Sequence, residues 1–225
     1  MVRQRRIRHH VNPLAVQYAA PRATALAVPA HLGPTAACDV ELGCADAQFS
    51  RELARNHPER LVVGLDIRER VVEFARLDAD AAGLGNLRLA YCNINVDLDR
   101  VLPAGSVDRF HLLFPDPWFK TKHHKRRVME PELLALLRTR LRRDGELHVA
   151  SDVYEIALEA MSEIDGDPCS GFTNVAGAWH FTRSNPYGAC SRREVTTHRR
   201  GLRVWRLRWR IDPPQDGVSI SIVGR

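Results

Sequence analysis

The stretch that decides the fold is Cys38-Asp39-Val40-Glu41-Leu42-Gly43, a short alternation of apolar and acidic residues closed by a glycine. It is followed by Leu61-Val62-Val63-Gly64-Leu65-Asp66, a continuous apolar run that ends in an acid. Further short apolar runs occupy residues 87–92, 109–114 and 146–150. Runs of this length indicate strands, and continuous ones are typical of strands buried on both faces. We therefore predict five strands in this part of the chain.

Two segments between these strands have helical spacing. Apolar side chains recur at every fourth position in residues 67–79, before Gly83, and in residues 133–141, after Pro131. Strands that alternate with helices indicate a parallel sheet, because a parallel crossover needs about a dozen residues or more.

The end of the chain has a different pattern. Residues 202–209 and 218–223 both alternate with period two, and residues 212–217 between them are rich in Pro, Asp and Gly. This pattern predicts an antiparallel hairpin. The predicted fold is therefore α/β and Rossmann-like: a mostly parallel sheet with helices on both faces and a C-terminal antiparallel hairpin.

Length and composition limit the organisation of the chain. A chain of 225 residues suits one domain. Residues 1–34 hold four prolines and lack periodicity, so we predict a basic N-terminal arm at 1–34 and a single domain at 35–225. No apolar run approaches the roughly 18 residues that cross a bilayer, and no secretory signal opens the chain, so we expect a soluble, cytoplasmic protein without a membrane partner.

Cysteines and histidines give no sign of a metal. The five cysteines are widely spread and form no CxxC pair, so we interpret them as reduced thiols. His180 and His198 lack partners at ligand spacing, and no metal site is predicted. Lys and Arg total 33 against 27 Asp and Glu, with the excess concentrated in residues 3–10, 120–127 and 192–210. Such clusters suit a phosphate backbone, although charge alone does not decide this.

Polar residues follow the first three strands, where ligands of doubly wound sheets bind. Gly43 permits a tight turn and a close ligand, whereas Ala45 and Ala47 break the GxGxxG pattern of pyrophosphate-binding loops. Asp66 is placed to accept ribose hydroxyls, and Asn93 to bond an adenine edge. Taken singly, Asp66 is equally well a helix cap and Asn93 a turn residue; their joint occurrence favours a nucleoside site.

The most informative stretch is Phe114-Pro115-Asp116-Pro117-Trp118-Phe119, where two prolines flank a carboxylate as the fourth strand ends. Basic residues crowd the next positions: Lys120, Lys122, His123, His124, Lys125, Arg126 and Arg127. A turn-forming acid and a solvated basic loop would explain the same residues. Their position directly after a rigid strand end favours a catalytic carboxylate beside a nucleic-acid contact.

Residues 114–127 resemble the FPDPWxKxxHxKRR signature of bacterial tRNA (guanine-N7)-methyltransferases. The similarity extends from about residue 8 to about residue 210, through Arg8-His9-His10-Val11-Asn12-Pro13-Leu14, Glu41-Leu42-Gly43-Cys44, Ser151-Asp152 and Ser191-Arg192-Arg193-Glu194. The chain departs from the family pattern at Ala45 and Ala47, which replace glycines, at Asn93, which replaces an acid, and at Arg193, which replaces an aromatic residue.

The resemblance implies a Rossmann-like methyltransferase that uses S-adenosylmethionine and acts on tRNA, at the variable-loop guanine at position 46. We expect a monomer or homodimer without an obligate protein partner. It implies a cofactor site at Glu41, Gly43, Asp66, Asn93 and Asp116, with Asp116 also catalytic. It implies contacts to the target nucleotide from Lys120, Asp152, Ser191, Arg192, Arg193 and Glu194. It implies contacts to RNA from Lys122, His123, His124, Lys125, Arg126 and Arg127.

Guanine N7 already carries an in-plane lone pair, so positioning should dominate catalysis. We expect Asp116, Asp152 or Glu194 to accept the N1–H and amine hydrogens of guanine. Two alternatives stay open. One is a methyltransferase of the same fold that acts on an exocyclic base nitrogen, and the other is a noncatalytic RNA-binding protein that has kept the fold.

Overall fold

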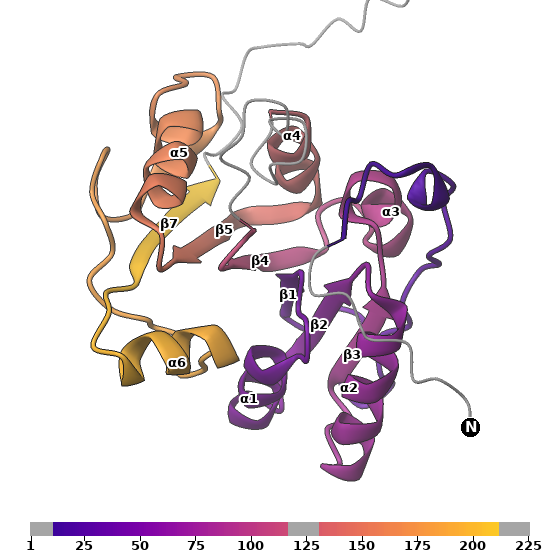
Figure 1. Cartoon of the computed structure of the whole chain (residues 1–225). Coiled ribbons are helices and arrows are strands. Elements are labelled where there is room, and N and C mark those ends of the chain that lie inside the picture. Colours follow the sequence, from indigo (N-terminus) through magenta and orange to yellow (C-terminus); the bar gives the residue numbers. More distant parts are fainter. Residues whose placement is uncertain (1–10, 117–130, 212–225) are drawn as a thin grey trace, which may run out of the picture.

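The computed structural model describes residues 11–116 and 131–211. Within them, one seven-stranded sheet has the order β3-β2-β1-β4-β5-β7-β6 (Figure 1). The strands are β1 (Cys38–Leu42), β2 (Leu61–Asp66), β3 (Leu87–Tyr91), β4 (Val107–Leu113), β5 (Leu141–Ser151), β6 (Phe172–Asn174) and β7 (Trp205–Ile211). The first five strands pair in parallel, and β7 is antiparallel to both β5 and β6.

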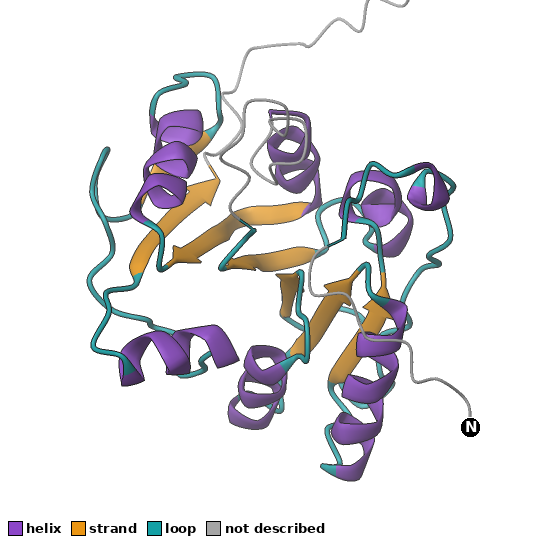
Figure 2. Ribbon diagram, viewed as in Figure 1, coloured by secondary structure: helices purple, strands orange, loops and turns teal. Residues whose placement is uncertain are grey.

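Helices cover both faces of this sheet (Figure 2). They are η1 (Val16–Tyr18), α1 (Gln48–Asn56), α2 (Glu69–Ala81), α3 (Ile94–Val101), α4 (Pro131–Arg140), α5 (Tyr154–Asp165) and α6 (Arg192–Arg199). On one face, a core cluster joins α3, α4 and α5 to the apolar side chains of the strands. On the other, a second cluster joins α1 and α2 to β2 and β3. None of the helices in residues 11–116 and 131–211 is long and apolar enough to cross a membrane.

The predicted fold class is confirmed, and strands β1 and β2 have the predicted bounds. The predicted helical segments are α2 and α4. The C-terminal end differs in detail, because the antiparallel partners of β7 in the structure are β5 and β6. The predicted second hairpin strand, residues 218–223, lies outside the described residues.

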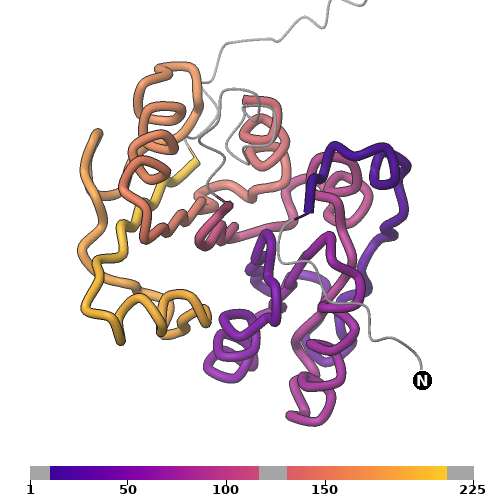
Figure 3. The backbone as a smooth tube through the Cα atoms, in the orientation of Figure 1, coloured from indigo at the N-terminus to yellow at the C-terminus, as the bar shows by residue number. Residues whose placement is uncertain are grey.

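The N-terminal arm runs along the outside of α3 before entering β1 (Figure 3). Asp97, buried in α3, accepts hydrogen bonds from the backbone amides of Arg22 and Ala23, at 2.8 and 3.2 Å. Asn93 Nδ2 donates to the carbonyls of Pro13 and Tyr18, at 3.0 Å each. The part of the arm that the structure describes is therefore attached to the same strand end that the sequence assigns to a cofactor. The domain boundary at residue 34 stays a prediction.

A buried polar network crosses the face of the sheet that α1 covers. His111 Nε2 contacts Asp39 Oδ1 at 3.1 Å, and His111 Nδ1 contacts His148 Nδ1 at 3.3 Å. Burial would raise the pKa of Asp39, but hydrogen bonds from His111 and Arg60 outweigh it and lower that pKa. Burial, and then the neighbouring positive charges, hold the pKa of His148 well below its ordinary value. The folded protein therefore keeps His148 neutral.

We predict a loss of stability in acid that depends on His148. As the pH falls through about 6.5, the unfolded chain binds a proton at this histidine and the folded chain does not. The free energy of unfolding should then fall by up to about 1.4 kcal/mol per pH unit for this proton. Urea unfolding at several pH values measures the slope, and His148→Phe should reduce it.

The exposed His31 supplies the matched control, because His31→Gln removes a histidine that is not buried. Its slope should match that of the unmodified chain. Equal slopes in His148→Phe and the unmodified chain would contradict the assignment.

Candidate active site

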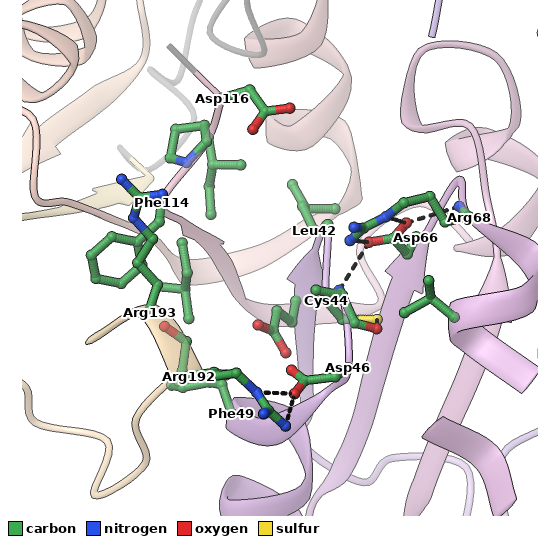
Figure 4. A pocket seen from close by; sticks show the side chains of 18 of the residues that line it. Leu42, Cys44, Asp46, Phe49, Asp66, Arg68, Phe114, Asp116, Arg192 and Arg193 are labelled. Carbon is green, nitrogen blue, oxygen red and sulfur yellow. Dashed lines mark hydrogen bonds and ion pairs between the residues drawn. The ribbon is translucent and has the colours of Figure 1, made fainter. Parts of the chain in front are cut away.

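The described residues enclose a cavity of about 1160 Å³ at the carboxyl ends of the parallel strands (Figure 4). Its walls come from the ends of β1 to β5 and from α6. Of the predicted site residues, it is lined by Glu41, Gly43, Asp66, Asn93, Asp116, Asp152, Ser191, Arg192 and Arg193. Small-molecule sites commonly measure about 300 to 1,000 Å³, so this cavity has room for more than one ligand at the same time. Lys120 and residues 122–127 lie outside the described residues.

The loop after β1 alternates into the left-handed region of the backbone. Gly43, Ala45 and Ala47 have φ values of 76°, 51° and 55°. Only glycine adopts this conformation without cost, and an alanine pays roughly 1–2 kcal/mol. A Cβ built on Gly43 would meet nothing within 4 Å, so the loop leaves open space there. Ala45 and Ala47 therefore adopt a left-handed backbone conformation that suits glycine, and this strains the loop.

Glu41, at the end of β1, is buried and bonded to the first turn of α1. Its Oε2 accepts hydrogen bonds from the Ser50 hydroxyl at 2.5 Å and from the Ser50 amide at 3.2 Å. Burial raises the pKa of Glu41 to about 8, although the Ser50 hydrogen bonds oppose the shift; the charges of Asp46 and Asp66 add to it. At neutral pH, Glu41 is therefore mostly protonated in the free protein. A cation arriving in the cavity would favour its ionised form.

Asp66, at the end of β2, is also buried and already holds several hydrogen bonds. Its Oδ2 accepts from the Ala45 amide at 2.9 Å and from Arg68 Nη2 at 2.8 Å. Its Oδ1 accepts from the Arg68 amide at 2.8 Å and from Arg68 Nε at 2.9 Å. A carboxylate offers about four lone-pair positions. A ligand hydroxyl that donates to Asp66 would therefore have to displace the Arg68 side chain.

Asn93 lines the cavity, but its side chain serves the protein itself. Its Oδ1 caps α3 by accepting from the Asn95 amide at 3.2 Å, while its Nδ2 is bonded to the arm. An adenine contact from this amide stays a prediction.

β4 leads into the cavity through a strained turn. Phe114 has a φ of 52°, which is unusual for a bulky residue, and its amide donates to Ala150 O on β5 at 2.7 Å. This bond fixes the direction in which Pro115 and Asp116 leave the sheet. The pKa of Arg68 is raised first by its hydrogen bond to Asp66 and also by the charge of Asp116. Asp116 therefore acts electrostatically on the Asp66–Arg68 pair.

α6 closes the opposite wall with two adjacent arginines. Arg193 Nε donates to both oxygens of Asp152, at 3.2 and 3.0 Å, and Arg192 forms an ion pair with Asp46 on the loop after β1 (Figure 4). The Thr197 hydroxyl also donates to Asp152, at 3.3 Å. α6 is thus attached to both the β1 and the β5 sides of the cavity.

Glu194 is not among the residues that line the cavity. Its side chain is 1% exposed, and its carboxylate forms an ion pair with Arg206 of β7. Ser191 caps the helix, because its hydroxyl accepts from the Glu194 amide at 3.2 Å. The structure therefore brings Asp116 and Asp152 to one cavity and places the Glu194 side chain behind it.

Arg68, Ser50 and Asp97 were not predicted from the sequence. Arg68 lies two residues after a predicted ribose carboxylate, a spacing that gives no sign of a bidentate contact. Asp97 lies four residues after Asn93, in the first turn of α3, where acids are generally favourable. That signal could have marked Asp97 as a structural acid, but not as the anchor of the arm.

Comparison with known proteins matches residues 35–207 to a methyltransferase family model described as "Putative methyltransferase". A tRNA (guanine-N(7)-)-methyltransferase of Trichormus variabilis is 36% identical over 204 residues, covering 89% of this chain and 94% of the relative. One of Synechococcus elongatus is 35% identical over 208 residues, with 89% and 94% covered.

Solved structures give the same architecture at lower identity. The 16S rRNA methyltransferase KamB superimposes with a TM-score of 0.56 at 21% identity, covering 81% of this chain and 92% of that one. A mutant 16S rRNA (adenine(1408)-N(1))-methyltransferase from Catenulisporales acidiphilia, solved with its cosubstrate SAM, gives 0.54 at 21% identity, with 84% and 92% covered. At this identity the likeness shows the fold, which is that of Rossmann-like methyltransferases.

We predict that Ala45→Gly stabilises the protein. The substitution removes the strain of a left-handed alanine, which is about 1–2 kcal/mol. It also makes the unfolded chain more flexible, which opposes folding by about 0.5–1 kcal/mol. The free energy of unfolding should therefore rise by about 0.5–1 kcal/mol, as measured by urea denaturation.

Ala135→Gly, on the exposed side of α4, is the matched control and should cost about 1 kcal/mol. A loss of similar size in Ala45→Gly would show that the loop is not strained at this alanine.

Proposed function

The chain belongs to the tRNA (guanine-N7)-methyltransferase family, and we propose that it transfers a methyl group from S-adenosylmethionine to N7 of a guanine in tRNA. By resemblance, the acceptor is the variable-loop guanine at position 46. We further propose that it works in the cytoplasm, as a monomer or homodimer without an obligate protein partner.

One observation supports this proposal most strongly: the carboxylates suited to the cofactor and those suited to guanine share one cavity. Glu41 and Asp66 lie at the ends of β1 and β2, and Asp116 and Asp152 at the ends of β4 and β5. The residues present suit the cofactor, which is cationic and carries hydroxyl groups. Two buried carboxylates, Glu41 and Asp66, could bind these groups, and the open space at Gly43 would let the ligand approach the backbone. S-adenosylmethionine, when bound, supplies an electrophilic methyl group on a positively charged sulfur.

In this proposal, two carboxylates of the cavity wall bind the cofactor. Asp66 accepts the two ribose hydroxyls after the Arg68 guanidinium has moved away. Glu41 loses its proton and offers a negative charge to the cationic part of the ligand. Both side chains are buried, so their interactions with a ligand are little weakened by water.

The acceptor wall then has to orient guanine. No base is needed to free the N7 lone pair, so the chain contributes position, which in well-aligned reactants saves on the order of 7–11 kcal/mol. Asp116, held by the turn at Phe114, accepts the N1–H and amine hydrogens of guanine, and Asp152 is the second acceptor once Arg193 releases it. Glu194 is buried in its ion pair with Arg206 and steadies α6. Lys120 would then touch the target nucleotide, and residues 122–127 the phosphates around it.

We predict that Asp116→Asn lowers kcat/KM about 10- to 150-fold, because a charged hydrogen bond contributes roughly 1.5–3 kcal/mol. The NH2 group of the asparagine would also face the N1–H and amine of guanine, which are themselves donors. The assay follows labelled methyl from S-adenosylmethionine into unmodified tRNA transcripts and identifies the product nucleoside by mass spectrometry.

Asp99→Asn is the matched control, because Asp99 is exposed on α3 and is not among the cavity residues. 7-Methylguanosine from the unmodified chain supports the proposal, and full activity in Asp116→Asn would remove Asp116 from it. Another methylated nucleoside would favour an exocyclic-nitrogen enzyme. RNA binding without transfer would favour a noncatalytic binder.

We also predict that cofactor affinity depends on pH through Glu41. In the free protein the pKa of Glu41 is about 8. A bound cation stabilises the carboxylate, so binding below pH 8 releases a proton. The affinity should therefore rise by up to about tenfold per pH unit between pH 6 and 8, and level off above. Calorimetric titration of S-adenosylmethionine in buffers of different ionisation enthalpy measures both the affinity and the proton release.

Glu41→Gln keeps the acceptor for Ser50 and removes the titration, so its profile should lack this component. Glu73→Gln, exposed on α2, should retain it. Identical profiles in all three proteins would exclude Glu41 as the titrating group.

A further inference from the structure

An aromatic cluster lies beside the cavity, on the face of the sheet that α5 covers. Trp205, at the start of β7, packs against Tyr154 and Phe181, with ring centroids 4.6 and 4.9 Å apart, and Tyr154 and Phe181 are 6.1 Å apart. The Tyr154 side chain is 43% exposed although it lies in a three-ring cluster. The start of β7, the first turn of α5 and the segment that joins β6 to α6 meet at this point (Figure 1).

The cluster continues directly from the cavity wall. Trp205 pairs with Ser151, and the next residue, Asp152, lines the cavity two positions before Tyr154. On the other side, Arg200 and Leu202 line the cavity shortly before Trp205. Residues within three positions of Tyr154 and of Trp205 therefore line the cavity, although the three rings themselves are not among its lining residues.

The charge around the cluster is positive. The Arg203 guanidinium lies over the Trp205 ring, 3.9 Å from its centroid. Arg183, Arg200 and Arg203 are exposed, and within residues 11–116 and 131–211 none of them forms an ion pair with a carboxylate. Two acids lie close to Tyr154 in sequence: Glu155, in the first turn of α5, and Asp152, which is paired with Arg193. Arginines without carboxylate partners beside an exposed tyrosine ring suit phosphates next to unpaired bases.

We propose that Tyr154, Phe181, Trp205 and Arg203 form a binding surface for the single-stranded nucleotides next to the target guanine. This inference rests on the proposed function and extends it. A guanine that enters the cavity has to leave its stack, so its neighbours lose stacking partners as well. Tyr154 offers a ring face to one neighbouring base, and Arg203, whose guanidinium lies over the Trp205 ring, offers that guanidinium to the phosphate or base plane beside it. Stacking on aromatic rings accepts any base, so the surface would select exposed, unpaired RNA rather than a sequence.

Binding of an unmodified tRNA transcript to full-length variants tests this surface by fluorescence anisotropy at several salt concentrations. Tyr154→Ala should weaken binding roughly 5- to 150-fold with little change in salt slope, and Tyr154→Phe should restore it. Arg203→Ala should weaken binding and reduce the slope by about one. Both variants should bind S-adenosylmethionine as tightly as the unmodified chain does.

Phe74→Ala and Arg70→Ala on α2 are the matched controls, because Phe74 is 55% exposed and neither residue is among those that line the cavity. Binding by Tyr154→Ala and Arg203→Ala as tight as in these controls would overturn the inference even if the unmodified chain forms 7-methylguanosine. Weaker binding in both, with no methyl transfer by the unmodified chain, would support the surface and reject the proposed function. Because Arg203 is exposed, its variant decides the outcome if Tyr154→Ala fails to fold.

Discussion

The buried carboxylate of Asp66 makes the hydrogen bonds on which the cavity end of the sheet depends. It ties the loop after β1, through the Ala45 amide, to the beginning of α2, through Arg68. A buried carboxylate is costly unless its lone pairs are satisfied. Arg68 satisfies them within the chain, so the wall is ordered before any ligand arrives. Ligand hydroxyls would then exchange with a guanidinium rather than fill a vacant site.

Arginine partners for two of the three acids explain why Glu41 and Asp66 can lie in one cavity with Asp46. Like charges in a buried site disfavour one another. Asp66 has Arg68 and Asp46 has Arg192, whereas Glu41 has only the neutral donors of Ser50 among the contacts that the structure gives it. Glu41 is therefore the group that takes up a proton. The cavity can present a further negative charge when a cationic ligand enters, without carrying that charge beforehand.

The sequence predicted the fold well where local pattern and burial agree. β1 and β2 are buried along their whole length, and their bounds follow from the apolar runs alone. The pairing of β7 with β6 could not be predicted from the sequence, because β6 has only three residues and tertiary contacts set its pairing. Within the site, the position after each strand located Glu41, Asp66, Asn93 and Asp116 at the cavity. It gave no information on where each side chain finds its partner.

Asn93 and Glu194 show why position alone is insufficient. Asn93 was predicted from its place after a strand and Glu194 from the resemblance, yet Glu194 is paired with Arg206 and Asn93 is bonded to the arm. Asn93 also shows what an amide supplies at this position. A carboxylate at this position could not donate to the carbonyls of Pro13 and Tyr18, whereas the amide donates to both. The amide of Asn93 therefore gives the end of β3 an attachment for the N-terminal arm that an acid at this position would not supply. Since Asp97 fixes the same arm through the amides of Arg22 and Ala23, the arm is attached to α3 by both donors and acceptors. Any movement of the arm in RNA binding would have to break these contacts beside the cavity.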